Sequence, residues 1–310
     1  MKAYKKAFLT AAALAMATAL SACGRDGADG ASSAAHDYTY VSLNGNEYAG
    51  TYTGSWAGGQ PDGEGSFSGE GVNGSLSIVG NWSGGQPNGE CRNILKTDAY
   101  VKTYSGNFFY GEVKGSGNYK AEDLEGNLVL TYDGEFRDGK YNGNGEQVYY
   151  YTAEEAAEHG YERRAYKGQF VNGQCQGEGE LTVYWSAEYA AQYGLDYTVY
   201  KGQYSDGAFV GETEMTIYYT QEIADADGID CTVYMGQRKD GHYVEPYRYA
   251  HYKNGKAIEE GRVRDGKYVS DGEKALGDSI YDLGRELAGD GILGDLYDIF
   301  APAVYDRDAE

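Results

Sequence analysis

The sequence predicts a mainly β fold, organised as an array of β-hairpins with short inserted helices and a C-terminal helical cap. Three observations carry this prediction. A 14-residue frame of aromatic residues and glycines recurs along the chain, side-chain types alternate within each copy, and helix start and stop signals fill the longer gaps. A frame that returns roughly every 20 to 50 residues is typical of repeat arrays, in which each unit buries its surface against its neighbours.

The first copy of the frame runs from Tyr52 to Gly65 and reads Tyr-x-Gly-x-Trp-x-x-Gly-x-x-x-Gly-x-Gly. Cys91 replaces the last glycine in the second copy, and Thr213 replaces it in the sixth. A degraded seventh copy starts at Tyr234. The copies between them start at Ile78, Tyr104, Tyr132, Tyr166 and Tyr200.

Each copy has the pattern of a β-hairpin. The first, third and fifth positions share one face of a strand, because side chains alternate with period two. Glycine-rich segments such as residues 58–63 then reverse the chain. Glycine weakens a strand unless it makes room for something. We therefore expect the glycines on the aromatic face to leave space for rings from a neighbouring strand.

The frame resembles the MORN repeat (membrane occupation and recognition nexus). The resemblance implies a single-layer, elongated and twisted antiparallel sheet of successive hairpins, here over residues 46–272. In other proteins such arrays accompany membrane contact, dimerisation and scaffolding. Successive copies start 26, 26, 28, 34, 34 and 34 residues apart, and the longer steps predict insertions.

The three 34-residue units each contain signals for a short helix. Thr152, Ser186 and Thr220 occupy one position and suit an N-cap, while a glycine eight residues later suits a helix stop. Asp225 to Asp230 resembles part of a calcium-binding loop, but Tyr234 stands where that loop needs a glutamate. The helix-stop interpretation is therefore favoured over calcium binding.

The N-terminus predicts a lipoprotein signal peptide over residues 1–22. Three lysines precede an apolar run from residue 7 to 20, and Leu20-Ser21-Ala22-Cys23 resembles a bacterial lipobox. Cys23 would carry a covalent lipid such as palmitate, the only group expected to be attached to the chain. The alternative is an ordinary signal peptide with a chance cysteine. Residues 23–45 are expected to form a flexible tether, and the protein to sit on the extracytoplasmic face of a bacterial cell membrane.

The C-terminal segment, residues 273–310, predicts helices. Leu276, Ile280, Leu283 and Leu287 follow helical spacing, and a second apolar cluster precedes Pro302. The favoured interpretation is a cap over the last repeat. A partner-binding helix is the alternative.

Catalysis and metal binding have little support in the sequence. No cysteines have zinc-ligand spacing, and no histidine holds a frame position. His242 and His251 could meet near Glu245, although a surface histidine is the simpler expectation. Cys91 is expected to be a packed residue, whereas a Cys175–Cys231 disulfide stays open. We therefore expect a non-enzyme with no metal and no cofactor.

The charge limits the partners. The formal net charge of −22 disfavours nucleic acid and phosphoinositide headgroups, so membrane attachment is expected through the lipid alone. The chain has 33 tyrosines, whose rings suit interfaces at low entropic cost. The predicted function is therefore a lipid-anchored envelope scaffold that binds a protein partner or itself. The alternative is a glycan-binding module.

The keyed aromatics are expected mainly to pack over repeat glycines and also to line an open binding face. These candidate residues are Tyr52, Trp56, Trp82, Tyr104, Phe108, Tyr132, Phe136, Tyr166, Phe170, Tyr200 and Tyr204.

Overall fold

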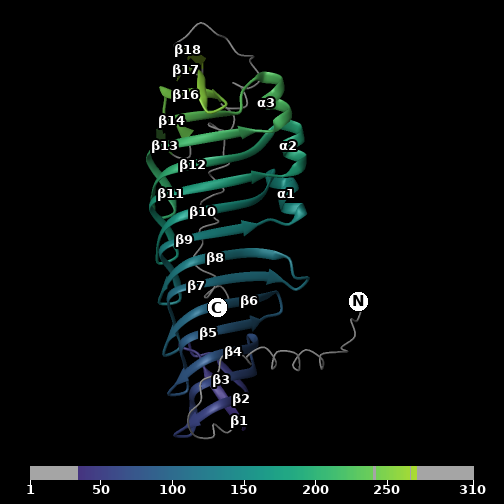
Figure 1. The fold of residues 1–310 in the computed structure, drawn as a ribbon, viewed down its shortest axis with the longest axis vertical. Coiled ribbons are helices and arrows are strands. Elements are labelled where there is room, and N and C mark those ends of the chain that lie inside the picture. Colours follow the sequence, from purple (N-terminus) through teal and green to yellow (C-terminus); the bar gives the residue numbers. More distant parts are fainter. Residues whose placement is uncertain (1–33, 240–241, 266, 271–310) are drawn as a thin grey trace.

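The computed structural model describes residues 34–239, 242–265 and 267–270. These residues form one elongated, open antiparallel sheet whose strands stack along the long axis of the molecule (Figure 1). The mainly β prediction is confirmed. The predicted lipidation at Cys23 and the predicted helical cap over residues 273–310 lie outside the described residues.

The sheet has 18 strands, and each pairs antiparallel with the next along the chain. The exception is the two-residue β15, which pairs with β14 alone, so that β14 also pairs with β16. The strands are β1 (Ala35–Val41), β2 (Glu47–Ala57), β3 (Gln60–Gly71), β4 (Gly74–Ser83), β5 (Gln86–Lys96), β6 (Tyr100–Phe109), β7 (Glu112–Asp123), β8 (Leu128–Arg137), β9 (Lys140–Tyr150), β10 (Tyr161–Val171), β11 (Gln174–Trp185), β12 (Leu195–Ser205), β13 (Ala208–Tyr219), β14 (Cys231–Lys239), β15 (His242–Tyr243), β16 (Tyr247–Lys253), β17 (Lys256–Arg264) and β18 (Lys267–Ser270).

A β-bulge interrupts the hairpins of the first six copies of the frame at the same place. In β2–β3, Gly54 opposes Gly65 and Trp56 opposes Pro61, so three residues of the returning strand face one of the outgoing strand. Gly63 lies in this bulge with φ of 100°, a conformation open mainly to glycine. The bulge re-aims the hairpin tip, which explains why the frame keeps a glycine there.

The keyed tyrosine of each intact copy lies over the last glycine of its own frame. A Cβ on Gly179 would lie 2.6 Å from ring atom Cε2 of Tyr166. The Tyr166 hydroxyl also donates a hydrogen bond of 3.2 Å to the Gln169 carbonyl oxygen. The same bond, three residues along the chain, forms from Tyr52, Tyr104 and Tyr132. The predicted packing of rings over glycines is thereby confirmed, with the ring coming from the same hairpin.

The two altered copies show what this packing requires. In the second copy Ile78 replaces the tyrosine, and Cys91 occupies the glycine position with its thiol donating to the Asn81 carbonyl. Without a ring there is room for a side chain, and Cys91 is buried as predicted. In the sixth copy Thr213 replaces that glycine and stands opposite Gly202, and the buried hydroxyl of Tyr200 makes no hydrogen bond among the described residues.

The three inserted helices form a column along one edge of the sheet (Figure 1). They are α1 (Ala153–His159), α2 (Ala187–Tyr193) and α3 (Gln221–Asp227), and each ends at a left-handed glycine as predicted. The Thr152 and Ser186 side chains cap α1 and α2, whereas Thr220 makes no side-chain cap bond. A Cβ on Gly160 would lie 2.6 Å from the ring of Tyr189 in α2, and one on Gly194 would meet Ile223 in α3. The stops of α1 and α2 are therefore each covered by the following helix, whereas Gly228 at the end of α3 has open space beside it.

The predicted tether is corrected at its C-terminal half. Residues 35–41 form β1, which pairs with β2 over its whole length. His36, predicted to lie in the tether, stacks on Trp56 with ring centroids 4.1 Å apart. The alternating segment Asp37-Tyr38-Thr39-Tyr40 has a strand pattern, but the glycine- and alanine-rich stretch before it masked that signal.

Candidate interaction face

The keyed aromatics form the core of the structure. Ten of the eleven candidate rings are at most 5% exposed, and only Trp56 is partly exposed. They pack edge to face along the sheet, as Tyr132 does on Phe136 with centroids 5.1 Å apart. The expectation that these rings line an open binding face is therefore wrong: they form a closed, buried row. The rings are closed off because rings of the next hairpin cover them, as Phe170 covers Tyr132 with centroids 5.2 Å apart.

A second row of side chains, most of them tyrosines, lies on the opposite face of the sheet. Its members sit directly across from one another on successive strands β9 to β16, and all are partly exposed. We call this row the tyrosine ladder. It consists of Tyr150, Arg163, Tyr184, Tyr197, Tyr218, Cys231 and Tyr252.

The three central rings of the tyrosine ladder, Tyr184, Tyr197 and Tyr218, lie against one another. Tyr197 and Tyr218 have centroids 4.4 Å apart and planes 18° from parallel. The Arg163 guanidinium lies 3.9 Å from the ring centroid of Tyr184, close enough for a cation–π contact. Burial raises the pKa of Tyr197 and of Tyr218; the neighbouring Tyr218 adds to the shift at Tyr197, and Cys231 adds to the shift at Tyr218. Both hydroxyls are therefore protonated at neutral pH and can donate hydrogen bonds.

Two further rows run beside the ladder on the same face. The first is small and apolar or hydroxylic: Val148, Ala165, Thr182, Val199, Thr216, Val233 and Ala250. The second, which we call the charged row, alternates in sign over five strands: Glu146, Lys167, Glu180, Lys201, Glu214, Met235 and Arg248. Within it, Lys201 forms an ion pair of 3.4 Å with Glu180. Neighbouring members are one strand spacing apart, about 4.8 Å.

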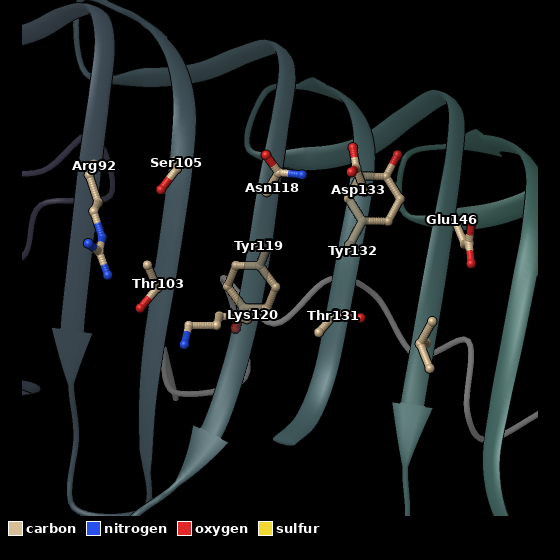
Figure 2. Close-up of a pocket in the computed structure, with 11 residues that line it drawn as sticks. Arg92, Thr103, Ser105, Asn118, Tyr119, Lys120, Thr131, Tyr132, Asp133 and Glu146 are labelled. Carbon is tan, nitrogen blue, oxygen red and sulfur yellow. The ribbon is translucent and has the colours of Figure 1, made fainter. Parts of the chain in front are cut away.

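The face is hollowed at two places. One hollow of about 740 Å³ lies along the charged row and reaches Gln203 and Glu212. The other, of about 550 Å³, lies over β5 to β9, where Arg92, Asn118 and Glu146 line it (Figure 2). Both are lined by hydroxyls, amides and charged groups that can hydrogen-bond a ligand.

The ladder could have been found from the sequence. Tyr150, Tyr184, Tyr218 and Tyr252 recur at the same 34-residue offset that reveals the helices. These residues lie outside the 14-residue frame, and a search confined to that frame passes over them. The structure adds what the offset alone does not give: Arg163, Tyr197 and Cys231 lie on the outgoing strands of the hairpins and fill the gaps between these tyrosines.

The favoured expectation of a surface histidine is wrong for His251, and the less favoured meeting with Glu245 does not occur either. His251 is fully buried rather than at the surface, and its Nδ1 lies 2.8 Å from the Thr232 hydroxyl. Its cross-strand neighbour is Glu259, whereas Glu245 is exposed. Burial lowers the pKa of His251, and the Glu259 carboxylate opposes part of that shift.

Among the described residues, no three or more histidine, cysteine, aspartate or glutamate side chains lie close enough together to hold a metal ion. Cys175 and Cys231 are free thiols, so the open question of their disulfide is answered. In the same part of the chain, no helix has the length and apolar character needed to cross a bilayer.

Comparison with known families identifies MORN repeats at four positions, residues 52–70, 79–92, 132–150 and 166–182. These segments coincide with the first, second, fourth and fifth copies of the frame. The copies that start at Tyr104 and Tyr200 form the same hairpins and bulges in the structure. No curated protein matches the chain at a significant level.

Proposed function

We propose that this chain is a non-enzymatic scaffold of the bacterial cell envelope, anchored by a lipid on Cys23, that binds a protein partner through the tyrosine ladder. The N-terminal lipobox pattern supports the anchor, and the MORN sheet supplies a rigid platform. The observation that carries the binding proposal is the continuous row of seven partly exposed side chains across β9 to β16, five of which are tyrosines.

The composition of the ladder suits a protein interface. Tyrosine and arginine are enriched at the residues that contribute most to binding, since they combine apolar area with a polar tip. The rings are already held by stacking, so little side-chain entropy is lost when a partner covers them.

The charge of this face differs from that of the whole chain. The ladder and the charged row together carry four cationic side chains and three carboxylates: Arg163, Lys167, Lys201, Arg248, Glu146, Glu180 and Glu214. The face is thus nearly balanced, although the chain has a formal net charge of −22. A protein can approach this face without the repulsion that the rest of the surface would impose on an acidic partner.

Glycan binding is the second candidate. The hollows present carboxylates and hydroxyls that could accept sugar hydroxyl hydrogen bonds. However, a sugar stacks on a free ring face, and the faces of Tyr184, Tyr197 and Tyr218 are covered by their ladder neighbours. The exposed edges and hydroxyls favour a protein.

The test is capture of envelope material by the full chain, purified in detergent and immobilised through a C-terminal tag, with and without protease treatment of that material. Tyr197→Ala removes the ring in the middle of the ladder, and Tyr100→Ala, an exposed tyrosine of β6, is the matched control. We expect capture to be protease-sensitive and about fivefold to thirtyfold weaker for Tyr197→Ala alone. Capture that survives protease would place glycan binding first. Equal capture by all three proteins would exclude the ladder.

A further inference from the structure

Arg164 on β10 is a buried cation that has no acidic partner among the described residues. It is 3% exposed and lies on the core face of the sheet, two residues before Tyr166. None of its three guanidinium nitrogens has a hydrogen-bond partner in the described part of the chain. The guanidinium lies against two rings instead, 5.1 Å from the centroid of Tyr151 and 5.0 Å from that of Tyr161. Cation–π contacts recover only part of the hydration that a buried charge loses, so this position favours the binding of an anion.

The equivalent positions of the next two 34-residue units hold a neutral side chain. They are Thr198 and Thr232. The Trp185 Nε1–H donates to the Thr198 hydroxyl over 3.1 Å, and the Tyr219 hydroxyl lies 2.9 Å from that of Thr232. A threonine therefore completes a buried hydrogen bond in both units, and the fold does not need a charge at the position of Arg164.

The rings around Arg164 also differ from their equivalents. Tyr161 takes the place of a fully buried aliphatic residue, Leu195 or Ile229, in the next two units. His159 stacks on Tyr161, with ring centroids 5.6 Å apart and planes 13° from parallel. Among the three units with an inserted helix, the cation and its rings thus occur together in one, which is typical of a site added to the repeat framework.

The Tyr151 hydroxyl lies beside this charge. It is buried and has no hydrogen-bond partner among the described residues. Burial raises the pKa of Tyr151, and the positive charge of Arg164 opposes only part of the rise, so the hydroxyl is protonated and neutral at pH 7. A neutral hydroxyl does not balance the guanidinium, but it can donate a further hydrogen bond to an anion that does.

The cluster reaches the surface through its rings. Tyr149, the cross-strand neighbour of Arg164, is partly exposed, and so are Tyr151 and His159. The rings of Tyr149 and Tyr151 pack together with centroids 4.9 Å apart. The guanidinium is therefore covered by side chains that have one side in solvent, and movement of the Tyr151 ring would admit a small molecule but not a folded chain.

We propose that Arg164 and the Tyr151 hydroxyl bind the carboxylate of a small organic acid. A guanidinium presents paired N–H donors whose spacing matches the two oxygens of a carboxylate. Its single positive charge balances a monoanion, whereas a phosphate dianion would keep an unpaired charge in a buried site. Arg164 faces the side of the sheet opposite the tyrosine ladder, so the proposal is independent of the proposed function.

The stability of the full chain in acetate tests the site. Urea unfolding in non-ionic detergent at pH 7.5 is compared in 100 mM sodium acetate and 100 mM sodium chloride. It is followed by the fluorescence of Trp185, whose ring lies 6.3 Å from that of Tyr161, in a background where the other two tryptophans are phenylalanine. A ligand as small as acetate is expected to bind with a Kd of about 1 mM, so acetate should raise the folding equilibrium constant about a hundredfold over chloride.

Three variants separate a binding site from a structural arginine. Arg164→Thr copies the next two units; it should be as stable as the unmodified chain in chloride and lose the response to acetate. Arg164→Lys keeps the charge without the paired donors and should respond at least tenfold less. Arg137→Thr removes an exposed arginine of β8 and, as the matched control, should keep the full response.

Three results would overturn the proposal. The first is an unmodified chain that acetate stabilises no more than chloride does. The second is an equal response to acetate in Arg164→Thr or Arg164→Lys and in the unmodified chain, which would be a general effect of the salt. The third is a marked loss of stability of Arg164→Thr in chloride, which would make the arginine part of the framework.

Discussion

The packing of Tyr166 over Gly179 makes a quantitative prediction for Gly179→Ala. The new methyl group would lie 2.6 Å from ring atom Cε2 and 2.7 Å from Cζ of Tyr166, a ring that is 2% exposed and cannot swing into solvent. Overpacking a core by one methyl group costs about 1–3 kcal/mol. Displacing the ring also breaks its bond to the Gln169 carbonyl, worth about 1 kcal/mol. We therefore expect a loss of about 2–4 kcal/mol in the free energy of unfolding.

The second copy of the frame suggests the compensating change. There an isoleucine stands at the tyrosine position and a larger residue occupies the glycine position, so Tyr166→Ile should make room for Gly179→Ala. The double variant should lose clearly less stability than the sum of the two single variants, a coupling that a double-mutant cycle measures.

The assay is urea unfolding followed by the fluorescence of Trp185, which lies on the same strand as Gly179, in a background where the other two tryptophans are phenylalanine. Gly202→Ala is the matched control, because its Cβ would meet nothing closer than 3.3 Å. If Gly179→Ala costs no more than Gly202→Ala, or if the two changes at 166 and 179 are simply additive, the ring-over-glycine argument fails.

Two further predictions concern the helix caps and the buried histidine. Thr152→Ala should lower the local stability of α1 by about 1 kcal/mol, measured as faster hydrogen exchange of its amides. Thr220→Ala should change the exchange of α3 little, because the Thr220 side chain makes no cap bond. Equal effects of the two substitutions would contradict this. The lowered pKa of His251 means that the unfolded chain takes up this proton first, so stability should fall as the pH drops below about 6.5, by at most about 1.4 kcal/mol per pH unit. Urea midpoints at pH 7.5 and 5.5 measure the effect, which should shrink in His251→Asn and persist in His159→Gln; an unchanged slope in His251→Asn would refute it.

The sequence predicts the units of this fold better than their arrangement. The alternation around Tyr132 and the cap signals at Thr152 and Gly160 are local, and the structure confirms the hairpins and the helix from them. The bulge between Gly134 and Phe136 is not visible in the alternation, because it depends on how many residues of the returning strand oppose the outgoing one. The alternation alone therefore predicts which face the keyed rings share, but not that ten of the eleven are buried.

The candidate site was harder to predict for a related reason. Tyr184 and Tyr197 are 13 residues apart in the chain and become neighbours only when β11 and β12 pair in their observed register. Register is set jointly by turn length, bulge and helix insertion, and a one-residue shift would turn either ring to the other face. The 34-residue offset identifies which tyrosines are equivalent, but only the pairing shows that they stack.

Because consecutive strands pair, the length of the molecule is proportional to the number of its hairpins. With one strand spacing of about 4.8 Å per step, the last strand stands about 80 Å from β1, and each hairpin contributes about 10 Å. Because a helix stop such as Gly160 is covered by the next helix and by nothing more distant, a whole 34-residue unit could be removed or duplicated without a mismatch at the junction. Duplication or loss of one unit would therefore change the length of the array while preserving the surface of every other unit.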